Sequence, residues 1–105
     1  MQGQLVNPAF VNYISKYKDL AIEQQRKHKV PAAITMAQGL LESAAGTSEL
    51  AVTANNHFGV KCTSDWKGRT VTADDDKSGE CFRRYADVSD SYEDHSLFLL
   101  RPRYA

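Results

Sequence analysis

The stretch Ala37-Gln-Gly-Leu-Leu-Glu-Ser-Ala-Ala-Gly46 decides how this sequence is interpreted. It belongs to a predicted helix over residues 32–45 that is apolar on most sides, as is typical of a central, buried helix. Glu42 is the exception, because it places a carboxyl group among apolar and small residues. Burying an ionised carboxylate costs several kcal/mol unless it is paired, so a buried Glu42 would keep its proton. A carboxylic acid of that kind can act as a general acid.

The neighbours of Glu42 are open to two interpretations. Gln38 lies one turn before it, and Ala45 and Gly46 lie one turn after it, so helical spacing puts all three on its face. The two small residues would leave room for a ligand beside the carboxyl group, which favours a catalytic acid. They would also let another helix pack closely, with Glu42 as an ordinary surface residue at a helix end.

Start signals and apolar periodicity predict the remaining elements. Asn7-Pro8 begins a first helix that runs to about Lys27, with Asn as the cap and Pro at the first helical position. Its apolar face is predicted to hold Phe10, Ile14, Tyr17 and Ala21. A short helix follows Thr47, strands are predicted over 58–62, 69–73 and 80–85, and a last helix is capped by Ser89-Asp90. Helices, a small antiparallel sheet and a final helix make an α+β fold, with a groove between two lobes.

Composition narrows the possible partners. The 105 residues fit one small domain, and the net charge of zero argues against a strong electrostatic grip on nucleic acid or anionic lipid. An uncharged partner such as a sugar chain is compatible with that charge. No apolar run approaches the roughly 20 residues that span a bilayer, and residues 1–4 lack the features of a signal peptide. The protein is therefore either cytoplasmic or exported by a signal upstream, and we expect a monomer.

The cysteines and histidines show no metal-ligand spacing, so we expect no metal. Cys62 and Cys81 form no close pair of the kind that binds zinc, and His28, His57 and His95 are widely separated. In a reducing cytosol the cysteines would stay free, and geometry decides whether they pair elsewhere. Because both are predicted on strands of one small sheet, we predict a disulfide between them.

Five motifs occur in order along the chain, namely Ala37–Gly46, Asn55–Lys61, Trp66–Gly68, Phe82–Tyr85 and Ser91–Leu99. Their order and approximate spacing, from about residue 8 to residue 105, resemble the glucosaminidase family of peptidoglycan hydrolases (glycoside hydrolase family 73), relatives of the flagellar muramidase and bacterial autolysins. The resemblance implies a lysozyme-like α+β fold, in which a cleft separates a helical lobe from a small β-hairpin lobe. It also implies a cell-wall substrate, no cofactor, and Glu42 as the general acid.

The family's second carboxylate is less clear in this sequence. Many members carry a Thr-x-Glu on the β-lobe, where this chain has Thr72-Ala73-Asp74. Asp74 is the first candidate, Asp76 the second and Glu80 the third, although the aspartates would also suit a solvated hairpin tip. A carboxylate separation of about 5–5.5 Å would suit retention of configuration and about 6.5–9.5 Å inversion. A third route uses the substrate's own N-acetyl group as the nucleophile.

Further residues are candidates for the sugar cleft. The substrate-binding set is Gln38, Asn56, Phe58, Trp66 and Tyr85. Core packing is the alternative for Phe58 and Tyr85, and a hydrophobic lid on the sheet is the alternative for Trp66. His95 is interpreted as structural.

Three functions follow from the resemblance. The first is an endo-β-N-acetylglucosaminidase that cleaves β-1,4 bonds of peptidoglycan in the cell envelope, either periplasmic or secreted. The second is a lysozyme or lytic transglycosylase, and the third is a non-catalytic wall-binding module. Family members often continue with a further helical segment beyond the position of residues 101–105, so a single domain over 1–105 is either truncated at its C-terminus or minimal.

Overall fold

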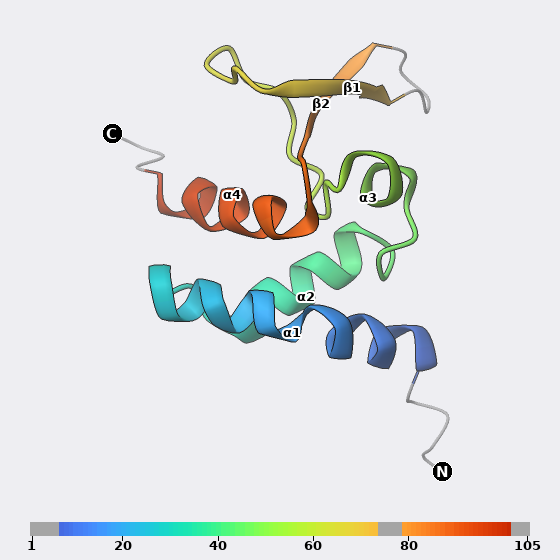
Figure 1. The fold of residues 1–105 in the computed structure, drawn as a ribbon, viewed down its shortest axis with the longest axis vertical. Coiled ribbons are helices and arrows are strands. Elements are labelled where there is room, and N and C mark those ends of the chain that lie inside the picture. The colour runs from blue at the N-terminus through green and yellow to red at the C-terminus, as the bar shows by residue number, and fades with distance from the viewer. Residues whose placement is uncertain (1–6, 74–78, 102–105) are drawn as a thin grey trace.

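The computed structural model describes residues 7–73 and 79–101, and these form helices on one side and a two-stranded sheet on the other (Figure 1). The elements are α1 (Pro8–His28), α2 (Ala32–Glu42), α3 (Glu49–Ala54), β1 (Arg69–Ala73), β2 (Glu80–Arg84) and α4 (Val88–Leu100). Helix α1 packs against both α2 and α4, and the sheet lies on the other side of α4 from α1. The predicted α+β arrangement of two lobes is confirmed.

Helix α1 begins as predicted but turns a different face inward. The Asn7 side chain caps the helix by accepting a hydrogen bond from the backbone N–H of Ala9 at 2.8 Å. The predicted apolar face is wrong in its first half, because Phe10 and Ile14 are 42% and 41% exposed. The residue buried there is Tyr13, whose hydroxyl group takes part in a hydrogen-bond chain inside the helical lobe.

Helix α2 ends three residues earlier than its sequence predicts. Its last residue is Glu42, and residues 44–46 all take left-handed backbone angles, with φ of 51°, 55° and 83°. The buried Ser43 side chain stabilises this turn, since its hydroxyl donates to the carbonyl of Gly39 at 2.6 Å and accepts from the N–H of Gly46 at 2.8 Å. A left-handed alanine costs on the order of 1 kcal/mol, so this turn persists because its surroundings hold it.

The β-lobe is a hairpin with one disulfide. Strands β1 and β2 are antiparallel, in the register that places Thr72 opposite Cys81. Cys81 is joined to Cys62, with 5.5 Å between their Cα atoms. The disulfide therefore ties the segment that leads into β1 to the second strand of the hairpin.

The predicted strand over 58–62 does not form, and only an isolated bridge joins Lys61 to Phe82. The amide oxygen of Asn56 accepts from the N–H of Val60 at 3.0 Å, whereas the Val60 carbonyl accepts both from the Asn56 NH₂ group and from the N–H of Arg83, each at 3.0 Å. A side chain thus takes the one backbone N–H that a longer strand ladder would use, while the carbonyl of the same residue still bonds to β2.

The core lies where the helices meet the segment that enters the β-lobe. Its buried cluster contains Ala21, Phe58, Val60 and Tyr92, and the half-buried residues packed against it are Tyr17, Leu20, Ala32, Met36 and Val88. A polar chain lies beside this cluster. The Tyr13 hydroxyl is 2.7 Å from His57 Nδ1 and 2.8 Å from the Tyr92 hydroxyl. These bonds connect α1, α4 and the loop after α3.

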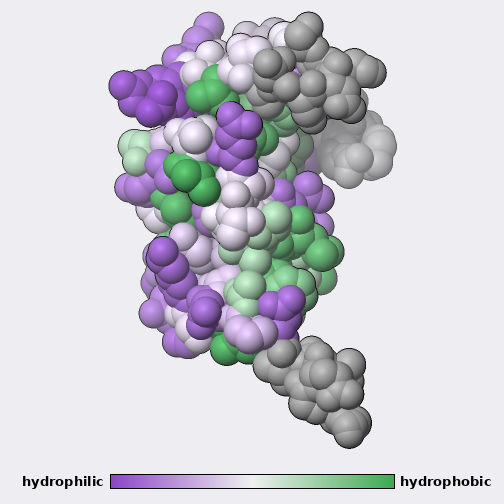
Figure 2. Space-filling view, turned by 90° about the vertical axis from the view of Figure 1, so that its right-hand side faces the viewer, coloured by the Kyte–Doolittle hydropathy of each residue, from purple (hydrophilic) through white to green (hydrophobic). Residues whose placement is uncertain are grey.

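The surface of the helical half carries apolar as well as polar areas (Figure 2). Its large exposed apolar side chains include Leu41 and Val52, which are 74% and 66% exposed. Among the described residues, no helix combines the length and apolar character that a membrane crossing requires.

Candidate active site

Glu42 lies at the C-terminal end of α2 and is exposed to solvent. The expectation that it is buried is therefore wrong. The helix stops at Glu42, so no further turn covers its carboxyl group, and Leu41 points outward instead of shielding it. The carboxyl lies beside Gly59, where a Cβ atom would stand 3.8 Å from Oε1 of Glu42. Gly59 has a φ of 65°, a backbone angle that favours glycine. Because glycine has no side chain, this side of the carboxyl group stays open.

Three elements converge beside Glu42. Gln38, one turn earlier on α2, is exposed, and its Oε1 lies 2.7 Å from Nε2 of His95 on α4. The His95 ring stacks on Phe58 with 3.9 Å between centroids and 15° between planes. Phe58 directly precedes Gly59. We call the five residues Gln38, Glu42, Phe58, Gly59 and His95 the Glu42 cluster.

Asn56 lies next to this cluster in sequence but is 1% exposed. Its side-chain NH₂ group donates to the carbonyls of Val60 and Arg83 at 3.0 and 2.8 Å, and its oxygen accepts from the N–H of Val60. All of these bonds go to the backbone. In this structure Asn56 joins the 56–60 segment to β2, and its amide faces no open surface.

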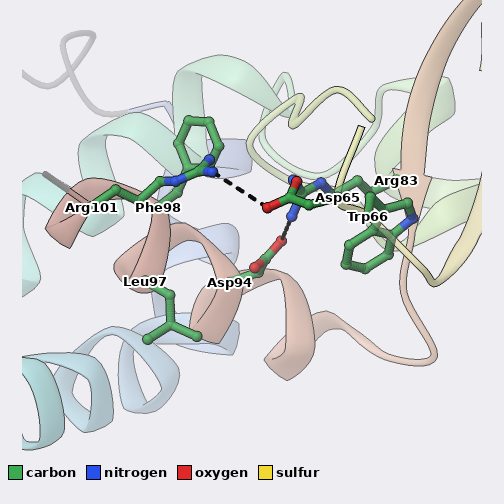
Figure 3. A pocket seen from close by; sticks show the side chains of 7 residues that line it. All are labelled: Asp65, Trp66, Arg83, Asp94, Leu97, Phe98 and Arg101. Carbon is green, nitrogen blue, oxygen red and sulfur yellow. Dashed lines mark hydrogen bonds and ion pairs between the residues drawn. The ribbon is translucent and has the colours of Figure 1, made fainter. Parts of the chain in front are cut away.

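A cavity of about 210 Å³ lies between the β-lobe and α4 (Figure 3). The residues that line it are Asp65, Trp66, Arg83, Asp94, Leu97, Phe98 and Arg101. Figure 3 shows Arg83 and Trp66 on one side and Asp94, from α4, on the other. Glu42 is not among the lining residues, so this cavity and the Glu42 cluster are separate features.

Trp66 and Tyr85 lie near Arg83, beside the cavity between the β-lobe and α4. The Arg83 guanidinium lies 4.5 Å from the centroid of the Trp66 ring, and the Trp66 Nε1–H donates to the backbone carbonyl of Arg69 at 2.9 Å. The Tyr85 hydroxyl is buried and donates to Oδ2 of Asp94 at 2.5 Å. Burial, together with that carboxylate, raises the pKa of Tyr85 far above its ordinary value. Neither side chain touches the Glu42 cluster through a hydrogen bond or a ring contact within the described residues.

The candidates for a second carboxylate are only partly described. Asp74 and Asp76 lie outside the described residues. Glu80, at the start of β2, has its side chain 39% exposed and paired with Lys61, with 2.7 Å between Oε2 and Nζ. In the described part of the chain, no three His, Cys, Asp or Glu side chains gather in a way that would hold a metal ion.

Sequence reasoning missed three partners that the fold brings in. Arg83 and Asp94 join the lobes, and His95 contacts Gln38. The available signal was the pair Asp94-His95, two polar residues in the last helix. Their partners, Arg83 and Gln38, are 11 and 57 residues away in sequence. The spacing of residues within the last helix therefore could not predict them.

Comparison with known proteins assigns the chain to a family. The family model of the glucosaminidases, described as mannosyl-glycoprotein endo-beta-N-acetylglucosaminidase, matches residues 18–105. The chain belongs to the glucosaminidase family. This confirms the resemblance drawn from the five motifs.

Individual relatives agree with the family. The exo-glucosaminidase LytG of Bacillus subtilis is 36% identical, over 88% of this chain and 34% of LytG. A peptidoglycan hydrolase from Sphingomonas sp. A1 superposes with a TM-score of 0.77 at 29% identity, over 90% of this chain and 64% of that one. The glycoside hydrolase domain of Salmonella typhimurium FlgJ gives a TM-score of 0.75 at 28% identity, with the same coverage. The chain thus spans about a third of LytG and somewhat less than two thirds of each structure.

Proposed function

We propose that this domain hydrolyses β-1,4 glycosidic bonds of peptidoglycan as an endo-β-N-acetylglucosaminidase, with Glu42 as the general acid. The observation that carries the proposal is the position of Glu42. It is an accessible carboxyl group where α2, the 56–60 segment and α4 converge, in a chain of the glucosaminidase family. Glu42 protonates the leaving oxygen as the bond to the anomeric carbon breaks, and a water molecule completes the hydrolysis.

The exposure of Glu42 in the free domain fits this role. A glycan chain lying on α2 and Gly59 displaces water from the carboxyl group. Excluding water strengthens the electrostatic interactions between the carboxyl group and the bound substrate. Gly59 contributes by lacking a side chain, since any Cβ at this position would occupy space beside Oε1 of Glu42.

The group that assists from the other side of the sugar is proposed to be one of three carboxylates or the substrate's own N-acetyl group. Asp74 is the first candidate and Asp76 the second, as nucleophile or as the base that activates water. Glu80 is the third, and its ion pair with Lys61 would have to open for it to act. The N-acetyl group of the substrate is the remaining route, for which the protein needs an acid and a group that orients the amide.

Digestion of purified peptidoglycan tests the proposal. The wild type is expected to release fragments with new N-acetylglucosamine reducing ends, identified by mass spectrometry, and Glu42→Gln should lower the rate by at least about 100-fold. Glu23→Gln, the same change on α1, is the matched control and should keep the wild-type rate. Anhydro-muramyl ends would indicate a lytic transglycosylase. Binding without cleavage would indicate a wall-binding module. An active Glu42→Gln variant would exclude Glu42 as the acid.

The relative LytG is named an exo-glucosaminidase, which makes exo-cleavage the second candidate. The two modes differ in the first products. An endo-enzyme shortens long glycan strands quickly and releases fragments of many sizes, whereas an exo-enzyme releases small sugars from strand ends while the strands stay long. Size separation of glycan strands early in the digestion distinguishes them.

Relatives that are peptidoglycan hydrolases support action outside the cytoplasm. We further propose that it is periplasmic or secreted and acts as a monomer. Light scattering of the purified domain tests the oligomeric state, and fractionation of cells that carry the full-length protein tests its location.

A further inference from the structure

His95 is held in one orientation inside the Glu42 cluster. The residue is 7% exposed, and its ring lies flat against Phe58 with 3.9 Å between centroids. Burial lowers the pKa of His95 to about 4, so the ring is neutral near pH 7 and carries one N–H.

The surroundings decide which ring nitrogen carries that hydrogen. Nδ1 of His95 is buried and has no hydrogen-bond partner among the described residues, whereas Nε2 lies 2.7 Å from Oε1 of Gln38. A hydrogen on Nδ1 would be a buried donor without an acceptor, which costs about 1–3 kcal/mol. Orphaned buried N–H groups are rarer than under-satisfied acceptors. The hydrogen therefore resides on Nε2, and His95 donates it to Gln38.

This donation fixes the orientation of the Gln38 amide. Because Oε1 accepts from His95, the NH₂ group of Gln38 occupies the opposite edge of the carboxamide. In the described part of the chain no acceptor takes a hydrogen bond from that NH₂ group, and Gln38 is exposed. Gln38 and Glu42 are four residues apart on one helix, so they share a face. The cluster thus presents a pure hydrogen-bond donor one helical turn from the proposed acid.

We propose that His95 is a positioning residue, which holds the Gln38 NH₂ group so that it donates to the acetamido carbonyl oxygen of an N-acetylated sugar. This inference rests on the proposed function. In a glycan, hydroxyls both donate and accept, whereas ether oxygens and the acetamido carbonyl only accept, and the amide carbonyl is the strongest of these acceptors. A fixed donor therefore matches the acetamido carbonyl. A sugar without its acetyl group offers an ammonium there, which only donates and leaves the Gln38 NH₂ group unpaired.

Three variants on α4 separate positioning from stability. His95→Phe keeps a flat ring against Phe58 but removes the donor, and His95→Gln returns an amide N–H that can reach Gln38 Oε1. Glu93→Gln is the matched control, because it breaks contacts of the same helix with α1 and leaves Gln38 untouched. On N-acetylated glycan His95→Phe should lower kcat/KM about tenfold, His95→Gln should restore most of it, and Glu93→Gln should leave it unchanged.

The decisive comparison uses the same glycan after removal of its N-acetyl groups. Wild type and His95→Phe should then have equal kcat/KM, because the acceptor of the Gln38 hydrogen bond is gone. An equal loss on both substrates would overturn the proposal, as would a comparable loss in Glu93→Gln or no recovery in His95→Gln.

Nuclear magnetic resonance tests the inference without catalysis. The ¹⁵N shifts of His95 should report hydrogen on Nε2, and tri-N-acetylchitotriose added to the Glu42→Gln domain should shift the Gln38 side-chain NH₂ resonances. Hydrogen on Nδ1, or unshifted Gln38 resonances with bound sugar, would overturn it. If the wild type cleaves no peptidoglycan while both signals appear as expected, the proposed function fails and this inference stands. If peptidoglycan is cleaved and the two signals are absent, the proposed function stands and this inference fails.

Discussion

Arg83 of β2 and Asp94 of α4 form an ion pair across the two lobes, with 2.9 Å between Nη1 and Oδ2 and with the Arg83 side chain 7% exposed. The same Oδ2 atom accepts the hydroxyl of Tyr85. Arg83 also donates to the carbonyl of Lys61 and to the hydroxyl of Thr63. One buried cation thus holds the β-lobe segments to α4.

We expect Asp94→Asn to lower the free energy of unfolding by about 3 kcal/mol. Removing one partner leaves a buried charge without compensation, which is the costly way to break such a pair. Glu80→Gln is the control, because the Lys61–Glu80 pair has side chains that are 60% and 39% exposed, and it should cost less than about 1 kcal/mol. Urea denaturation of the variants measures both. Equal costs would show that the Arg83–Asp94 pair contributes no more than a surface pair.

Gly39 and Tyr13 should be energetically coupled. A Cβ at Gly39 would stand 2.8 Å from the Tyr13 hydroxyl, so Gly39→Ala alone should destabilise the domain by about 1–3 kcal/mol through overpacking. Tyr13→Phe removes the nearer of two hydroxyl oxygens, since the Tyr92 hydroxyl would stand 3.1 Å from the same Cβ. The double variant should therefore be more stable than the sum of the two single changes predicts, by about 1 kcal/mol or more.

Gly79→Ala provides the control for this comparison of single and double variants. Its φ is 86° and nothing lies within 4 Å of the added Cβ, so it should cost only backbone strain and be additive with Tyr13→Phe. Thermal or urea denaturation of the single and double variants gives the coupling energies. Additive behaviour at Gly39 would rule out the close contact.

The fold could be predicted where the signal is local. Asn7-Pro8 determines the start of α1 because the cap needs only its own neighbours. The strand over 58–62 is reduced to one bridge, because the side chain of Asn56 takes the N–H of Val60 while the Val60 carbonyl still accepts from the N–H of Arg83. Apolar periodicity does not predict such a side-chain contact. The last helix begins earlier than predicted because Asp87, and not Ser89-Asp90, caps it by accepting from the N–H of Asp90; here two local capping signals lie close together and the earlier one is used.

The sequence predicted which residues of α2 form the candidate site, but not which residues of other elements contact them. Glu42 and Gln38 share a face by helical spacing, which sequence alone provides. The exposure of Glu42 depends on the left-handed turn that follows, and alanines at residues 44 and 45 give no sign of such backbone angles. The contact of Gln38 with His95 joins positions 57 residues apart, and it depends on how α2 and α4 both pack against α1.

Stability should fall in acid through Glu93. Hydrogen bonds from Lys27 and His28, with a further one from Gln24, lower the pKa of Glu93 from 4.5 to about 2. A carboxylate whose pKa is lower in the folded state contributes stability above its unfolded pKa and loses it as the pH falls. The contribution should therefore disappear between about pH 4.5 and pH 2. Because the Glu93 side chain is 33% exposed, we expect only about 1 kcal/mol.

Glu93→Gln tests this window. At about pH 7 the variant should be less stable than the wild type by that amount, and the difference should shrink towards zero near pH 2, where Glu93 is protonated and resembles Gln. Urea denaturation across this pH range gives both values. A difference that does not change with pH would mean that the charge of Glu93 contributes nothing.

Reduction of the disulfide should loosen the β-lobe. Cys62 and Cys81 are 19 residues apart in sequence, and closing a loop of about this length stabilises a domain by roughly 3 kcal/mol. In the unfolded, unreduced protein we expect no alkylation of thiols, and after reduction we expect two alkylated cysteines by mass spectrometry. Hydrogen exchange should then accelerate in β1 and β2 and stay slow in α1. Two reactive thiols before reduction would contradict the bridge.

The left-handed turn after Glu42 has a consequence for how this sequence tolerates changes of length. Glu42 is the last residue of α2. The left-handed turn that Ser43 stabilises directly after it prevents the helix from continuing. One residue inserted between Gln38 and Glu42 would rotate the carboxyl group by about 100° around the helix axis relative to Gln38. An insertion in the loop after Thr47 would leave both side chains where they are. Between Gln38 and α3, insertions and deletions that keep the cluster intact are therefore confined to the far side of this turn.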